Sequence, residues 1–172
     1  MKILLVVYDN GSYAHVFPMG MGAISAILEQ NGHEVVIYNQ DMHHYPDEHL
    51  TEYLDNNEFD VLAVSLIAGY YQYKRLLGLS QAINRSKNRP VYVIGGYGPT
   101  PEPEFFVKKT GCDIVVLGEG ETTAVRLMDA IENKTSLKDV LGIAYREGDK
   151  VLINQRPPQI EDLDSLPRYA YH

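Results

Sequence analysis

The sequence predicts an α/β protein with a doubly wound, five-stranded parallel sheet, and two features of the chain lead to this fold class. Short runs rich in β-branched residues alternate with segments that have helical spacing. Most runs are apolar without interruption rather than alternately apolar and polar, which is typical of parallel strands buried on both faces. The five predicted strands are residues 3–7, 34–38, 61–64, 91–94 and 114–117.

The segments between these runs carry helix signals. Pro18 is placed to open the first helix, and Asn31-Gly32 can close it in a left-handed conformation. Pro90 ends the third helix, because proline cannot continue one. Apolar residues at helical spacing predict helices after residue 18, around 50–54, around 76–83, from 101 to about 109, and around 124–131.

Five strand–helix units joined by right-handed crossovers favour the flavodoxin-like (Rossmann-like) strand order 2-1-3-4-5 over a classical dinucleotide fold, which would need more strands. Residues 143–153 alternate around a turn and predict an appended C-terminal β-hairpin that would shield a sheet edge. Residues beyond 156 have no period and indicate a linker that packs on something. We expect a domain at 1–140, the hairpin at 141–155 and the linker at 156–172.

Composition narrows the classes of partner. At 172 residues and 45% hydrophobic, the chain can bury a real core. Its net charge of −8 and lack of a Lys/Arg cluster argue against nucleic acid and anionic membranes. No apolar run approaches the ~20 residues that span a bilayer, and residues 3–7 are too short for a signal peptide. The single Cys112 excludes an internal disulfide, so we expect a cytoplasmic location.

Ligands of an open parallel sheet bind outside the carboxyl ends of its strands, so the loops that begin there hold the candidate site. Ser65 offers a hydroxyl on one loop, and Gly95 and Gly96 offer a bare backbone that a ligand can approach closely on the next. The candidate residues are Asp9, Asn10, Gly11, Tyr13 and His15; Ser65, Leu66 and Ile67; Gly95, Gly96, Tyr97, Gly98 and Thr100; and Gly118, Glu119, Gly120 and Glu121.

Other chemistries find weaker support. One cysteine and no paired histidine spacing leave no metal site, and His43-His44 is interpreted as a turn. A triad of Ser65, His15 and Asp9 would lack a nucleophile elbow. Gly118-x-Gly120 lacks the third glycine of a dinucleotide fingerprint. Because Glu119 and Glu121 flank it, this loop suits a neutral hydrogen-bonding ligand tail better than phosphate.

The spacing of two motifs on neighbouring strands resembles a known family. Ser65-Leu66-Ile67, followed after 27 residues by Gly95-Gly96, is similar to the Ser-x-Leu and Gly-Gly elements of the cobalamin-binding domains of methionine synthase and the acyl-CoA mutases. The resemblance implies that the serine and the glycines border the dimethylbenzimidazole tail. The third element, Asp-x-His-x-x-Gly, is incomplete: Asp9 matches, whereas Gly11 stands where the cobalt-ligating histidine would be and Ala14 where the glycine would be.

Nearly the whole chain resembles the N-terminal domain of cobalamin-dependent radical S-adenosylmethionine (SAM) enzymes of the class B methyltransferase and anaerobic porphyrin cyclase type, which commonly lack that histidine. The matching segments are 18–20, 32–35, 95–102, 116–121, 142–146 and 162–167. The resemblance implies base-off cobalamin with no histidine below the metal. It also implies that S-adenosylmethionine and a [4Fe-4S] cluster bind a downstream radical SAM domain of the full-length protein, for methyl transfer or cyclase-type chemistry.

Two alternatives stay open. One is a flavodoxin-like module for FMN or a nucleotide, in which Tyr70, Tyr71, Tyr73 and Tyr97 could stack on a flat ring. Against it, the first loop lacks the Ser/Thr-rich composition that cradles a phosphate. The other is a domain that only docks partners and has lost its ligand.

Overall fold

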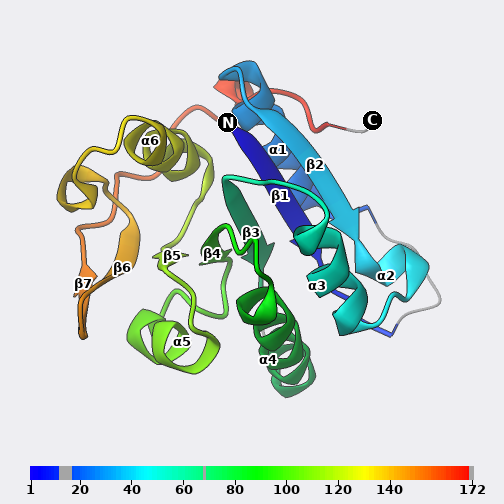
Figure 1. Cartoon of the computed structure of the whole chain (residues 1–172). Coiled ribbons are helices and arrows are strands. Elements are labelled where there is room, and N and C mark those ends of the chain that lie inside the picture. The colour runs from blue at the N-terminus through cyan, green and yellow to red at the C-terminus, as the bar shows by residue number, and fades with distance from the viewer. Residues whose placement is uncertain (12–16, 68, 171–172) are drawn as a thin grey trace.

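The computed structural model describes residues 1–11, 17–67 and 69–170, which form one mixed sheet between two layers of helices (Figure 1). The strand order is β2-β1-β3-β4-β5-β6-β7. β1 to β5 are parallel, and β6 and β7 are antiparallel to their neighbours, so the predicted fold and order are confirmed. The strands are β1 (Lys2–Val7), β2 (Glu34–Asn39), β3 (Val61–Ser65), β4 (Val91–Gly95), β5 (Ile114–Val116), β6 (Ile143–Glu147) and β7 (Lys150–Ile153).

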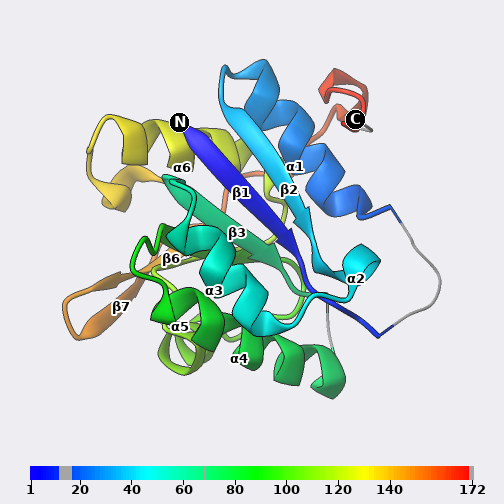
Figure 2. The same cartoon turned by 45° about the vertical axis from the view of Figure 1, so that its right-hand side comes forward.

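Helices cover both faces of the sheet (Figures 1 and 2). α1 (Met19–Gln30) and α6 (Glu121–Glu132) pack on one face. α3 (Asp47–Asp55), α4 (Tyr70–Arg85) and α5 (Pro103–Thr110) pack on the other. The remaining elements are α2 (Gln40–His43) and two single 3-10 turns, η1 (Leu137–Asp139) and η2 (Leu163–Ser165).

Burial on both faces explains the continuous apolar runs. Along β3, Leu62 and Val64 belong to the core beneath α3, α4 and α5, whereas Val61 and Ala63 pack into the core beneath α1 and α6. Successive side chains of a strand point to opposite faces, so neither set can be polar.

One helix lies where the sequence shows only a polar connector. Residues 40–43 form α2, and the side chain of Asn39 caps it by accepting a hydrogen bond from Met42 N at 3.0 Å. A single turn has no hydrophobic period, so periodicity could not predict it.

The C-terminal hairpin extends the sheet. β6 pairs with β5 over Ile114↔Tyr145 to Val116↔Ile143, so it covers the edge that β5 would otherwise expose, as predicted. The segment beyond the hairpin packs back on the domain: Ile160 N donates to Glu119 Oε2 at 3.1 Å, and Ala170 N donates to Gly22 O at 3.2 Å. None of the described helices is long and apolar enough to cross a membrane.

Candidate functional site

The loops after β3 and β4 are joined by backbone hydrogen bonds at the carboxyl end of the sheet. Ser65 pairs with Gly95 in the last register position of the two strands. Leu66 N donates to Gly95 O at 2.9 Å, and Gly98 N donates to Leu66 O at 3.1 Å. The side chain of Leu66 is buried, so it anchors its loop in the core rather than facing a ligand.

Thr100 connects this pair of loops to the loop after β5. Its hydroxyl donates to Gly96 O at 2.8 Å and accepts from Gly118 N at 3.1 Å. Three of the predicted loops therefore form one bonded edge, which we call the rim: residues 65–67, 95–100 and 118–121. Such a fixed edge is the kind of preformed surface on which sheet ligands bind.

Gly96 has a structural role that its place in the sequence did not reveal. Its φ is +97°, and a Cβ there would overlap the carbonyl oxygen of Leu66 and lie 2.9 Å from Ser65 Oγ. The group that lies in the side-chain direction of Gly96 is the protein's own backbone, and the approach of a ligand to this glycine stays a prediction. Gly96 is required by the loop itself.

Gly95 and Ser65 lie side by side at the ends of their strands. Both lie two residues after Val93 and Ala63, which pack into the core beneath α1 and α6, so both face the same side of the sheet. Among the residues that the structure describes, a Cβ on Gly95 would meet only Val116 Cβ, at 3.7 Å, which is an ordinary contact. Ser65 Oγ makes no hydrogen bond to any residue that the structure describes. A hydroxyl without a partner among the described residues thus lies beside a strand end that has no side chain.

In the loop after β5, one residue is open to a ligand and the others contact neighbouring segments of the protein. A Cβ on Gly118 would meet no atom of the described residues within 4 Å, so its backbone is open to approach on that side. Glu119 accepts the hydrogen bond from Ile160, and a Cβ on Gly120 would lie 3.2 Å from Ile24 Cδ1 of α1. Glu121 is the first residue of α6. Gly118 is the part of this loop that a ligand can approach most freely.

The loop after β1 is held through Asp9. Asp9 N donates to Gln40 Oε1 at 3.2 Å, and Asp9 Oδ1 accepts from Gly11 N at 2.6 Å and lies 3.2 Å from His44 Nδ1. Burial acts to raise the pKa of Asp9, but the Gly11 hydrogen bond and the neighbouring His44 and Arg75 hold that pKa below its ordinary value. Asp9 is therefore an ionised anchor of the loop at neutral pH.

Further contacts position this loop from α2 and α4. Asn10 N donates to Asp41 Oδ1 at 2.6 Å, and Arg75 Nε donates to Asp9 O at 3.1 Å. These partners were missed in the sequence, where His44 was interpreted as a turn residue. No local pattern could reveal them, because they lie 31 to 66 residues from the groups they bind. Two candidates, Tyr13 and His15, lie outside the described residues.

Large apolar side chains stand exposed beside the rim. Ile67 is 64% exposed, Tyr97 is 85% exposed, and Tyr71 in the first turn of α4 is 55% exposed. Exposed apolar side chains gathered at one place mark a binding surface more often than isolated ones do. A large, mostly apolar ligand with hydrogen-bonding groups fits this combination of side chains, the Ser65 hydroxyl and the bare glycine backbone.

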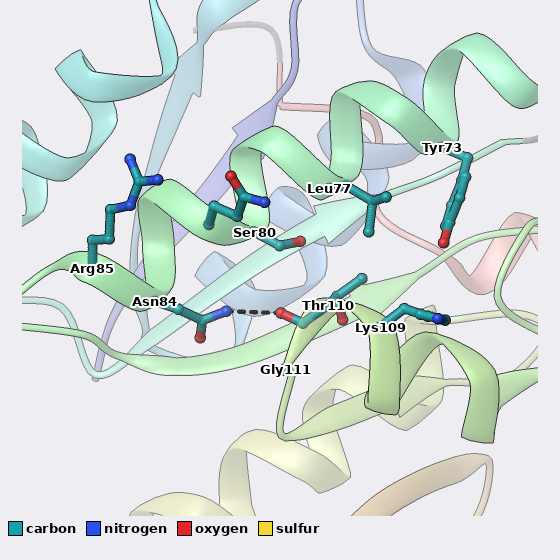
Figure 3. A pocket seen from close by; sticks show the side chains of 9 residues that line it. Tyr73, Leu77, Ser80, Asn84, Arg85, Lys109, Thr110 and Gly111 are labelled. Carbon is teal, nitrogen blue, oxygen red and sulfur yellow. Dashed lines mark hydrogen bonds between the residues drawn. The ribbon is translucent and has the colours of Figure 1, made fainter.

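A pocket on the flank of the domain does not involve the rim. It lies between α4 and α5 (Figure 3), and Asn84 Nδ2 donates to Thr110 O across it at 2.7 Å. Asn84 lies in the last turn of α4 and Gly111 precedes β5, so much of its lining is at the amino end of the strands, away from Ser65 and Gly95. The lining residues are Tyr73, Leu77, Ser80, Gln81, Asn84, Arg85, Lys109, Thr110 and Gly111. Among the described residues, no cluster of three or more His, Cys, Asp or Glu could hold a metal ion.

Comparisons with known proteins place most of the chain in one family. The family model described as B12 binding domain matches residues 7–128. The anaerobic magnesium-protoporphyrin IX monomethyl ester cyclase of Synechocystis sp. is 26% identical over 165 residues, covering 90% of this chain and 33% of that protein. The cytidylyl-2-hydroxyethylphosphonate methyltransferase of Streptomyces wedmorensis is 29% identical over 187 residues, covering 94% of this chain and 34% of that protein.

Solved structures share the fold. The radical S-adenosylmethionine methyltransferase TsrM from Kitasatospora setae, with cobalamin and a [4Fe-4S] cluster bound, superposes with a TM-score of 0.76 at 18% identity, over 96% of this chain and 30% of TsrM. The cobalamin-dependent S-adenosylmethionine radical enzyme OxsB gives a TM-score of 0.74 at 18% identity, over 98% of this chain and 24% of OxsB. The chain spans about a third of the length of the curated relatives it matches.

Proposed function

The chain belongs to the family of B12-binding domains, and from this membership we propose that its rim holds cobalamin base-off, with no histidine below the cobalt. The observation that carries the proposal is the pairing of Ser65 and Gly95 at the strand ends, where a hydroxyl that bonds to none of the described residues adjoins backbone without a side chain. We assign the nucleotide tail to this position and the corrin to the exposed apolar side chains Ile67 and Tyr97. Gly11 has no side chain with which to ligate the metal.

Bound cobalamin supplies a cobalt centre that can carry a methyl group or change oxidation state. The residues of this chain would bind and orient that centre, and Asp9 holds the loop after β1 in place. We propose that residues 156–172 lead toward a radical SAM domain of a longer protein, which would hold S-adenosylmethionine and a [4Fe-4S] cluster. A cyclase and a methyltransferase both occur among the relatives, so the proposal includes methyl transfer and cyclase-type chemistry. A cytoplasmic location, expected from the single cysteine, is part of the same proposal.

The flavodoxin-like alternative finds less support. A phosphate would need an uncompensated helix N-terminus or cationic side chains. At the rim, α6 begins with Glu121 and is preceded by Glu119. Tyr73, one of the rings proposed to stack on a flavin, lies in the flank pocket against Phe105 and Phe106 instead.

The test is reconstitution with hydroxocobalamin, followed by desalting and measurement of bound cobalt and the absorbance spectrum. We expect about one cobalamin per wild-type chain with a base-off spectrum. Gly95→Val should lose at least tenfold in retention, because its methyl groups enter the space we assign to the tail. Circular dichroism checks that the fold is unchanged.

Ile153→Ala is the matched control, because Ile153 is an exposed residue of β7 at the far edge of the sheet. It should retain cobalamin as the wild type does. A folded Gly95→Val chain that binds cobalamin normally would contradict the assignment of the tail. FMN retained in place of cobalamin would establish the alternative.

A further inference from the structure

The flank pocket is the floor of a groove between α4 and α5. Tyr73 and Leu77 point from α4 toward Lys109 and Thr110 of α5 (Figure 3). The ring of Tyr73 lies 5.8 Å from that of Phe105, centroid to centroid. The hollow has a volume of about 560 Å³, and none of the described residues that line it is acidic. The groove therefore has an apolar floor large enough to receive side chains of another molecule.

The outer edge of α4 forms one side of this groove. Tyr70, Lys74, Gln81 and Arg85 recur at helical spacing and are all exposed. Gln81 and Arg85 belong to the lining, and Lys74 lies two turns before Gln81 on the same edge. Lys74 Nζ lies 4.8 Å from the centroid of the Tyr70 ring. This side of the groove thus presents an aromatic ring and two cationic side chains.

α5 repeats the arrangement on the other side. Phe105 is 42% exposed, and Lys109 follows it by one turn, with its Nζ 6.0 Å from the centroid of the Phe105 ring. The neighbouring Lys108 pairs with Glu104 at 2.6 Å, so its charge is already matched. An ammonium group beside a ring face stays close to apolar surface. Both sides of the groove therefore combine an aromatic ring with a cation.

The charge of the groove is opposite to that of the protein as a whole. α4 carries three Lys or Arg and no Asp or Glu over its 16 residues, whereas the whole chain has 15 basic and 23 acidic residues. Arg75 contacts Asp9 and Asp47, which leaves Lys74 and Arg85 as the cations that α4 contributes to the groove. An acidic partner is repelled by most of such a surface and attracted to this face, so charge complementarity selects the groove.

We propose that the groove between α4 and α5 is a docking surface for an acidic amphipathic helix of a partner protein. The apolar face of that helix rests on Tyr73 and Leu77, and its carboxylates face the groove cations, Lys74, Arg85 and Lys109. The 16 residues of α4 extend over about 24 Å, so the groove accommodates a partner helix of about four turns. None of the rim residues lines the groove, so docking leaves the rim free.

A displayed library of random 16-residue peptides tests the proposal without assuming a partner sequence. Selection against the whole chain should yield peptides that are enriched in Asp and Glu and carry apolar residues at helical spacing. Fluorescence anisotropy then gives the dissociation constant of each selected peptide. Lys74→Glu combined with Lys109→Glu should weaken binding at least tenfold, because an attraction on each side of the groove becomes a repulsion. Leu77→Gln should weaken it at least fivefold, because the floor loses its apolar contact.

Lys134→Glu combined with Lys138→Glu is the matched control. Both lysines are exposed, and they follow α6 on the opposite face of the sheet. The change in net charge is the same as in the groove double variant, so a general effect of charge would appear equally in both. The control should bind the selected peptides within twofold of wild type, and circular dichroism checks that every variant is folded.

The inference is overturned if the selected peptides are not acidic, if the groove double variant binds them as wild type does, or if the control loses the same affinity. A dimer of the chain that the groove double variant abolishes would assign the groove to a second copy instead. An oligothymidylate that binds the groove as tightly as the peptides would assign it to nucleic acid. Cobalamin retention should be unchanged in the groove double variant, and its loss would overturn the separation of the groove from the rim.

Discussion

Substituting alanine at two adjacent glycines should have unequal effects on stability, although both lie at the end of β4. Gly96→Ala places a methyl group against the carbonyl oxygen of Leu66 at a φ of +97°. A non-glycine residue in such a conformation costs about 1–3 kcal/mol. Moving Leu66 away breaks its hydrogen bond from Gly98 N, which contributes about 1 kcal/mol. We therefore expect Gly96→Ala to lower the free energy of unfolding by about 2–4 kcal/mol.

Gly95→Ala should change the free energy of unfolding by less than about 1 kcal/mol. Its methyl group would lie 3.7 Å from Val116 Cβ, and alanine loses less backbone entropy in a strand than glycine does. Urea unfolding followed by circular dichroism measures both. With a slope of about 2 kcal/mol per molar, Gly96→Ala should move the midpoint by about 1–2 M. A midpoint for Gly96→Ala within experimental error of wild type, or an equal loss in Gly95→Ala, would refute the assignment of Gly96 to a backbone contact.

Two further predictions concern ionisable groups. The pKa of Asp9 lies below its ordinary value, so the stability that its carboxylate contributes is present above pH about 4 and is lost as the pH falls through the pKa of the folded state. A carboxyl-carbon NMR titration should give a midpoint below 3.8. A midpoint at or above that value would contradict the hydrogen bonds from Gly11 and His44. Cys112 is fully buried, and burial raises the pKa of its thiol to about 11, so a thiol reagent at pH 8 should label it only after unfolding in urea; rapid labelling of the folded chain would show that this side chain is accessible.

Local sequence patterns were enough to predict the fold, because each strand, helix and turn depends on residues close to it in the sequence. The run at residues 61–64 is apolar on both faces, Pro18 and Asn31-Gly32 bound the first helix, and the alternation around residues 147–150 makes the hairpin. These features act over a few residues, so they are legible in the sequence. The strand order followed from the general preference for right-handed crossovers and needed no individual contact.

The sequence by itself also determined which residues could form a site: Ser65 and the glycines after the strands were recognisable as loop residues at one edge. Tertiary structure decided what each of them does. Gly96 lacks a Cβ, which leaves room for the Leu66 carbonyl oxygen beside it. Glu119 accepts a hydrogen bond from the C-terminal segment, and Thr100 bonds to two loops. Arg75 reaches the first loop across 66 residues of chain. Contacts of this kind depend on how the helices pack on the sheet. They join residues far apart in the sequence, so no periodic sequence pattern predicts them.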